Sequence, residues 1–204
     1  MKTGRFLPII LIGLATPVVA ETSPPVRSAI TLLQYGRETG QPDLMIGGFR
    51  ALQLARRDRP GLSLQEQNGG VIRAGEAMSE LIAEARFLAR GDAALLQRLE
   101  GMDPAGAGGA IPIDIDAASE RYFVVPAGEG LPDQLGILAF GAGAASLAVL
   151  SAAGQVLCQS GGGTKRDATC PLGVDDPAVT DGSGPVIRVS NGADRKRTVW
   201  LYVP

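Results

Sequence analysis

Residues 101–116, GMDPAGAGGAIPIDID, divide the chain into two parts with different patterns. The glycines and the proline of 101–109 are typical of a linker, because neither residue favours a regular helix or strand. From 111 to 115 isoleucine then stands at every second position, a period of two that indicates a half-buried strand. We therefore expect helices before this stretch, a glycine-rich linker at 104–112, and strands after it.

The part before the linker, residues 21–103, has the pattern of helical hairpins. Apolar side chains recur at helical spacing between breaks that contain Gly, Pro and Asp. Asp43 and Asp92 follow two of these breaks, where a carboxylate can cap the first N–H groups of a helix. The adjacent Gly47 and Gly48 lower helix propensity and indicate a close approach to the preceding helix. The expected helices are 26–37, 44–57, 72–90 and 93–99, with a polar loop at 61–70.

The part after the linker, residues 113–204, has the pattern of a β-sandwich. Short apolar stretches alternate with clusters of Gly, Pro, Asp and Asn, as in sheets built from many short strands. The expected fold class is α+β in two segregated parts, with helical hairpins followed by an antiparallel, jelly-roll-like sandwich. After the isoleucine stretch, the expected strands are 121–125, 134–140, 145–151, 155–158, 186–190 and 198–203.

Both parts resemble known modules. The order SLAVLS, AAGQ, VLCQ over 146–159, a glycine loop with a second cysteine, VIRVSN at 186–191 and TVWLYVP at 198–204 is similar to the pre-peptidase C-terminal type of β-sandwich. That family is appended to secreted bacterial enzymes. The resemblance implies an accessory role in secretion, substrate contact or fold stability, and it transfers no catalytic residue. The helices loosely resemble tetratricopeptide-style hairpins without their diagnostic residues.

Residues 1–20 have the composition of a secretory signal peptide. Lys2 and Arg5 precede a short apolar run, and Val18 to Ala20 fit the small-residue rule for cleavage. A membrane anchor is the alternative, but it needs about 20 apolar residues, and two prolines and a glycine interrupt this run. We expect a periplasmic or secreted mature protein that meets a membrane only through its export signal.

The chain has two cysteines, Cys158 and Cys170. An oxidising compartment favours their pairing, and the polar, glycine-rich residues 159–169 predict a hairpin loop that a disulfide would staple. Two separate buried thiols are the alternative. The Cys-x-x-Cys motif of thiol oxidoreductases is missing, so the pair does not imply redox chemistry.

Composition excludes several functional classes. The sequence has no histidine, which removes Ser-His-Asp and Cys-His catalysis and histidine-ligated zinc. Loss of Lys2 and Arg5 would take the net charge from −2 to −4, and an acidic protein gives no support for binding nucleic acid. We expect no cofactor and no nucleic-acid partner.

One glycine motif invites a cofactor interpretation. After a strand-like stretch, Gly141, Gly143 and Ser146 have a spacing close to the dinucleotide-binding fingerprint. The residues that follow are strand-like and carry both cysteines, whereas a nucleotide fold needs further βα units. We therefore favour a glycine turn between two strands.

A second group of residues invites a metal interpretation. Asp114 and Asp116, with Glu120 or Asp133, can supply oxygen ligands for calcium. The alternative, which we favour, is that Asp114 and Asp116 face solvent on an edge strand. We therefore predict no metal-binding residues.

Three glutamates, Glu76, Glu80 and Glu84, share one face of an expected helix. A small envelope hydrolase can use such carboxylates as acid and base. Glutamates four residues apart are more often a solvated stripe, here balanced by arginines, so we predict no catalytic residues.

The candidate partner-binding residues are a basic cluster and an aromatic pair. Arg56, Arg57 and Arg59 can meet an acidic partner, or they can form a solvated turn. Trp200 and Tyr202 share one face of the last strand and can stack on sugars or peptides, although filling of the core is the favoured alternative. We expect a non-catalytic binding or scaffolding protein with a protein partner, or a glycan, in the bacterial cell envelope. A structural or secretion-accessory subunit is the further alternative.

Overall fold

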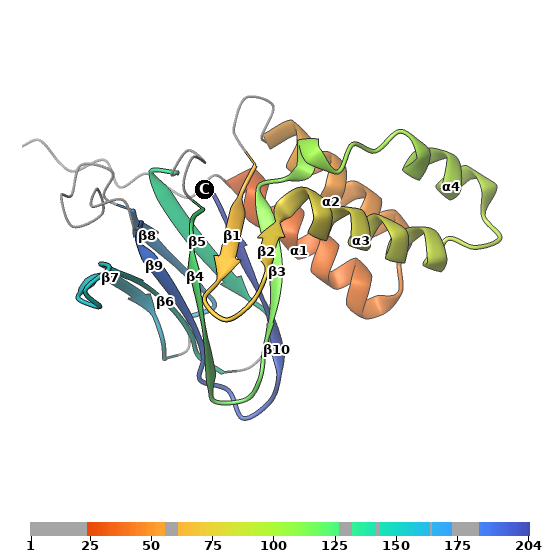
Figure 1. Cartoon of the computed structure of the whole chain (residues 1–204). Helices are drawn as coiled ribbons and strands as arrows, with labels where there is room; N and C mark the ends of the chain where they lie inside the picture. Colours follow the sequence, from red (N-terminus) through yellow and green to blue (C-terminus); the bar gives the residue numbers. More distant parts are fainter. Residues whose placement is uncertain (1–23, 56–60, 127–131, 142, 164, 173–183) are drawn as a thin grey trace, which may run out of the picture.

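The computed structural model describes residues 24–55, 61–126, 132–141, 143–163, 165–172 and 184–204. Two antiparallel sheets pack face to face, and helices cover the outer face of one of them (Figure 1). The predicted fold class is confirmed, because the described residues form helical hairpins and an antiparallel sandwich as largely segregated parts. The predicted signal peptide lies outside the described residues.

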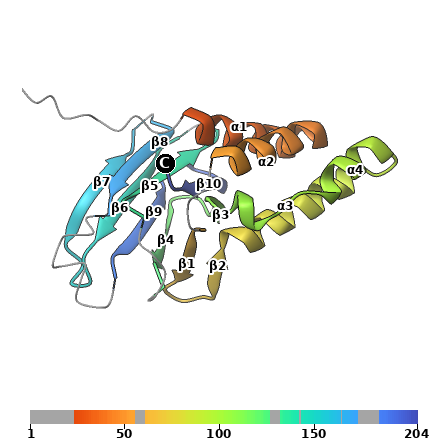
Figure 2. The same ribbon diagram turned by 90° about the horizontal axis from the view of Figure 1, so that it is seen from above.

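The helices form two hairpins. α1 and α2 run side by side, whereas α3 and α4 project away from the sandwich (Figures 1 and 2). Asp92 caps α4 as predicted, since its Oδ1 accepts the N–H of Leu95 at 3.0 Å. Asp43 lies in the first turn of α2 and is not its cap, because the helix already begins at Pro42. The bounds are α1 Pro24–Thr39, α2 Pro42–Ala55, α3 Ala74–Leu88, α4 Ala93–Glu100 and a 3-10 helix, Ala105–Ala107.

Neither hairpin contains a membrane-spanning segment: none of the four helices in the described ranges is long and apolar enough to cross a bilayer.

The strands form a six-stranded sheet in the order β2-β1-β4-β9-β6-β7 and a four-stranded sheet in the order β3-β10-β5-β8. Without β1 and β2, four strands remain in each sheet, in the order of an eight-stranded jelly roll. The bounds are β1 Ser63–Glu66, β2 Val71–Arg73, β3 Ala110–Ile115, β4 Ser119–Val124, β5 Gln134–Ala139, β6 Ala145–Leu150, β7 Val156–Gly161, β8 Asp167–Pro171, β9 Val186–Asn191 and β10 Arg197–Tyr202.

The four-stranded sheet is buried on both faces, and β10 shows this best. Val199 and Leu201 point into the core between the two sheets. Trp200 and Tyr202 point the other way and pack among the helices. Successive side chains of a strand alternate between faces, so the unbroken apolar run of β10 reflects burial on both sides.

Two glycines allow α1 and α2 to pack closely. A methyl group on Gly48 would lie 2.6 Å from Cγ of Leu33, and one on Gly36 would lie 2.8 Å from Cγ of Met45. The predicted close approach is therefore confirmed at Gly48. At Gly47 the nearest such contact, with Leu32, is an ordinary 4.0 Å.

The predicted polar loop at 61–70 is wrong. Its residues belong to a hairpin, β1–β2, that extends the six-stranded sheet through pairing of β1 with β4. Leu62 and Leu64 are buried in the sandwich core, and an apolar residue at every second position is a strand pattern. The predicted boundary at residue 103 therefore does not separate two domains, because β1 precedes that residue and belongs to the sandwich.

The predicted linker at 104–112 is also wrong. It contains the 3-10 helix and the first residues of β3. Ala107 and Ala110 are buried with the helices, and Ile111 is buried between the sheets. Small residues here allow the chain to pass closely between helices and sheet, so the glycine-rich composition serves packing.

The disulfide between Cys158 and Cys170 is confirmed, with a Cα–Cα distance of 5.8 Å. The predicted hairpin loop between the cysteines is wrong. Cys158 lies on β7, which pairs with β6, whereas Cys170 lies on β8, which pairs with β5 in the other sheet. The bond therefore joins the edge strands of the two sheets.

An ion pair holds the β1–β2 hairpin on the sandwich. Arg121 of β4 donates from Nε and Nη2 to the two carboxylate oxygens of Glu66, each at 2.7 Å. These hydrogen bonds outweigh partial burial and lower the pKa of Glu66 below its ordinary value. The paired side chains are 27% and 29% exposed, so solvent weakens this pair less than a fully exposed one.

We expect Glu66→Gln to lower the free energy of unfolding by about 1 kcal/mol at pH 7. Because the folded-state pKa is depressed, the pair stabilises fully above the unfolded-state pKa of about 4.3, and this stability disappears as the pH falls through the folded-state pKa. Urea unfolding of the wild type and the variant at several values from about pH 7 to about pH 3 measures the difference in their free energies of unfolding. The wild type and the variant should converge at the acidic end.

Glu76→Gln is the matched control. Glu76 also pairs with an arginine, Arg73, but their side chains are 62% and 56% exposed. An exposed pair contributes little, so we expect a change within about 0.5 kcal/mol. Equal losses in the two variants would contradict a special role for the Glu66 pair.

Candidate functional site

A polar cavity of about 490 Å³ lies where α1 meets the four-stranded sheet near its β3 edge. α1, β3, the end of β5, the β9–β10 turn and the first residues of β10 all contribute to it. The lining residues are Gln34, Glu38, Asp114, Phe140, Gly141, Arg195, Lys196, Arg197 and Thr198. Five of these nine residues are charged, and they include both signs.

The α1 side of the cavity is connected to the core by a chain of hydrogen bonds. The indole Nε1–H of Trp200 donates to Oε1 of Gln34 at 2.8 Å. Nε2 of Gln34 in turn donates to Oε1 of Glu38 at 2.8 Å. This fixes the orientation of the Gln34 amide, because its oxygen must face the indole. The carboxylate of Glu38 is the exposed end of this series of hydrogen bonds.

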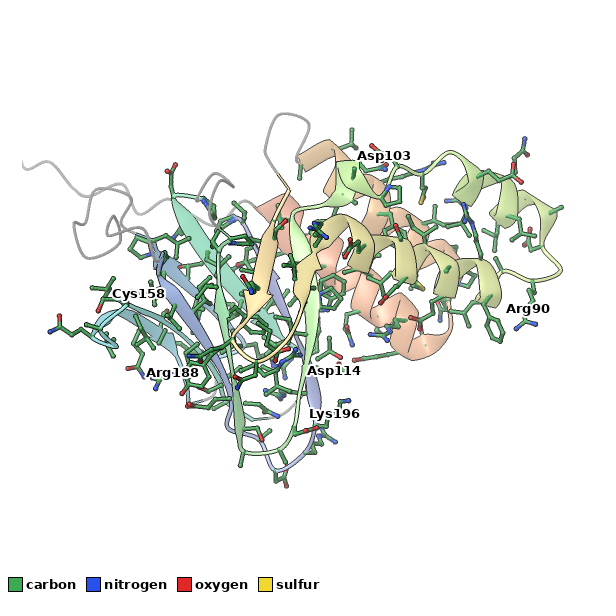
Figure 3. All side chains as sticks on the ribbon, viewed as in Figure 1. Arg90, Asp103, Asp114, Cys158, Arg188 and Lys196 are labelled. Atoms are coloured by element: carbon green, nitrogen blue, oxygen red, sulfur yellow. A yellow bond between two sulfur atoms is a disulfide. The ribbon has the colours of Figure 1, made fainter. Side chains whose placement is uncertain are left out.

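The β3 side of the cavity presents an engaged carboxylate. Thr198 donates to Oδ1 of Asp114 at 2.8 Å, and Lys196 lies 3.1 Å from its Oδ2. Figure 3 shows Asp114 and Lys196 close together at this edge. Burial opposes ionisation, but the bonds from Thr198 and Lys196 outweigh it and lower the pKa of Asp114. Asp114 is therefore an ionised partner of Lys196.

The turn that carries the cations is held by a buried asparagine. Asn191, at 1% exposure, donates to the carbonyl oxygens of Ile115, Asp116 and Arg195. Its own oxygen accepts the N–H of Ala193 at 3.0 Å. This network ties the β9–β10 turn to the end of β3, and it places Arg195 and the residues after it at the cavity.

Two arginines converge on one wall of the cavity. A methyl group on Gly141 would lie 3.5 Å from Nη2 of Arg195 and 3.6 Å from Nη2 of Arg197. Arg197 is 6% exposed, and its Nη1 donates to the carbonyl oxygen of Gly143 at 3.2 Å. Burial lowers the pKa of Arg197, and the charges of Arg195 and Arg166 lower it further. The wall is therefore a cluster of like charges.

The aromatic pair does not form an exposed stacking surface. Trp200 and Tyr202 are both 0% exposed and fill the space between the helices and the sheet. The favoured alternative, that both side chains fill the core, is therefore confirmed. Trp200 still touches the site indirectly, through Gln34. The basic cluster of Arg56, Arg57 and Arg59 lies outside the described residues.

The glycine motif is a turn, as favoured. Gly141 and Gly143 both have positive φ, at 88° and 106°, and they lie between β5 and β6. Gly141 lines the cavity, so one residue of the motif contributes to the candidate site, but not as part of a nucleotide-binding loop.

The carboxylates considered for calcium or catalysis do not converge. Asp114 and Asp116 are exposed on the edge strand β3 and its end, as favoured, and among the described residues no group of three metal-ligating side chains gathers. On α3, Glu84 pairs with Arg37 at 3.0 Å and Glu76 with Arg73. None of the three α3 glutamates lines the cavity.

Sequence reasoning missed most of the cavity. It considered Asp114 as a metal ligand or a solvent-facing residue, and it did not predict a site role for Gln34, Glu38, Arg195 or Arg197. One signal was present, since Arg195, Lys196 and Arg197 are three consecutive cations where the last strand begins. These cations stand closer together in the sequence than Arg56, Arg57 and Arg59, which Asp58 interrupts.

Comparisons with known proteins do not extend these assignments. No known protein family matches the chain, and a search of curated proteins finds no relative. The candidate site therefore rests on its own geometry.

Proposed function

We propose that the protein is an exported, non-catalytic binding protein of the bacterial cell envelope. Its polar cavity would receive a charged group of a protein partner, with a glycan as the second class of ligand. The export signal expected at residues 1–20 and the disulfide support an oxidising, extracytoplasmic location. The resemblance to accessory sandwiches of secreted enzymes points the same way.

The observation that carries the proposal is the cavity between α1 and the four-stranded sheet. A concave site with several convergent polar groups is the usual form of a ligand site. Here the carboxylate of Glu38 faces the cavity from α1, and Arg195 of the β9–β10 turn and Arg197 at the start of β10 line it from the other side. Such an arrangement recognises charge, and it requires no chemical step.

Photo-crosslinking in the envelope tests the proposal. A photoreactive amino acid replaces Glu38, which lines the cavity from an exposed position. The tagged protein is irradiated in cells and captured under non-reducing conditions, and its adducts are identified by mass spectrometry. We expect a defined adduct at position 38. Arg98, an exposed residue of α4, carries the same probe as the control and should give none.

The outcomes separate the alternatives. A protein adduct supports the proposed partner class, and a carbohydrate adduct moves the assignment to a glycan. Equal adducts at positions 38 and 98 would overturn the cavity as the binding site. Substrate turnover that is lost on changing Glu76, Glu80 or Glu84 would replace the proposal with the hydrolase alternative.

A further inference from the structure

Arg195 of the β9–β10 turn and Arg197 at the start of β10 line the same wall of the cavity. Nη2 of Arg195 and Nη2 of Arg197 both lie within 3.6 Å of the position that a Cβ of Gly141 would occupy. Residue 141 is a glycine with a φ of 88°, so it places no side chain beside the two guanidinium groups. The two guanidinium groups therefore lie near each other on the cavity wall beside Gly141, where one oxyanion can contact both.

The charges of Arg195 and Arg166 are not paired with a carboxylate within the described part of the chain. Lys196 is engaged by Asp114 at 3.1 Å. No carboxylate lies within ion-pair distance of Arg195 or Arg166 among the described side chains, and both arginines act on Arg197 as like charges. Like charges gathered beside a cavity repel one another, and a bound anion relieves that repulsion.

We propose that this wall of the cavity is an oxyanion site, at which Arg195 and Arg197 bind a carboxylate, sulfate or phosphate group of the ligand beside Gly141. The inference rests on the proposed function, since it places the ligand in the same cavity, and it adds the chemical class of the group recognised. Guanidinium groups suit all three anions, because their paired N–H donors match two oxygens.

The protein carries its own reporter of binding. Its one tryptophan, Trp200, donates to Gln34, which lines the same cavity. A ligand that alters the orientation or hydration of Gln34 changes the environment of the indole. The fluorescence of the intact protein therefore reports on the site without an added label.

The test uses the mature protein at low ionic strength, with inorganic sulfate, inorganic phosphate and acetate as separate probes. Radiolabelled sulfate in equilibrium dialysis counts bound anions directly, and Trp200 emission follows all three probes. We expect saturable binding in the range of ~1–10 mM, as for a small ligand with few contacts. Preference for acetate identifies a carboxylate ligand, and preference for sulfate or phosphate identifies a sulfated or phosphorylated one.

Variants distinguish the site from general attraction. Arg195→Gln removes an exposed cation of the wall, and we expect it to weaken anion binding about tenfold or more. Arg195→Lys keeps the charge and should recover part of the affinity. Arg98→Gln removes an exposed cation of α4 and should leave binding within about twofold. The thermal unfolding curve of each variant confirms that it folds.

Two results would overturn the inference. One is the absence of bound sulfate, phosphate and acetate in the wild type. The other is an equal loss in Arg195→Gln and Arg98→Gln, which indicates nonspecific attraction. If anions fail to bind but the crosslink at position 38 forms, the oxyanion site fails and the binding function stands. If anions bind but no crosslink forms at position 38, the oxyanion site stands and the proposed binding function fails.

Discussion

Trp200→Ala should lower the free energy of unfolding by about 3–5 kcal/mol, as expected when a fully buried large aromatic is truncated. Trp200 is 0% exposed and packs between β10 and the helices. The change also leaves the buried oxygen of Gln34 without its indole donor, which adds a desolvation penalty. Urea unfolding followed by far-UV circular dichroism measures the loss, since the variant has no tryptophan fluorescence.

Two further variants identify the cause of that loss. Trp200→Phe keeps most of the apolar bulk but removes the N–H, so we expect a smaller loss of about 1–2 kcal/mol. Tyr35→Ala truncates an aromatic side chain of α1 that is 55% exposed, and it should change stability by less than about 1 kcal/mol. A loss at Trp200 no larger than that at Tyr35 would contradict the packing described for the helix layer.

Removal of the disulfide should have the next largest effect. Cys158→Ala combined with Cys170→Ala should lower the free energy of unfolding by about 3 kcal/mol, because the bond restricts the unfolded chain over a separation of 12 residues. Its position adds to this expectation. β7 and β8 are the edge strands of different sheets, and the bond holds the two sheets together on this side.

Reduction provides the control for this prediction. Dithiothreitol should destabilise the wild type by a similar amount and leave the double variant unchanged, since the variant has no bond to reduce. Equal stability of oxidised and reduced wild type, measured by urea unfolding, would show that the sandwich holds its edges together without the bond.

The sequence predicted the elements whose apolar pattern is simple. The four helices and the strands from β3 to β7, β9 and β10 are found close to their expected positions, because their apolar residues recur in regular patterns between turn residues. The disulfide also followed from composition and compartment. These features depend on the spacing of residues within one short segment, which is visible in the sequence.

The features that the sequence did not reveal depend on distant partners. The strands of the β1–β2 hairpin are only four and three residues long, and its pairing partner β4 lies far along the chain. β8 was hidden by glycine and polar residues around the cysteines. The cavity combines α1 with the β9–β10 turn, and no local pattern links Gln34 to Arg195.

The position of β10 has a consequence for the order in which the chain can fold. β10 pairs with β3 and β5 at the centre of its sheet, and Trp200 bonds Gln34 across 166 residues of sequence. Contacts so distant along the chain slow folding, because a long loop must close before they form. The sandwich and its helical cover can be completed only after the last strand is made. A polypeptide that remains unfolded until then is in the state that the proposed export would require.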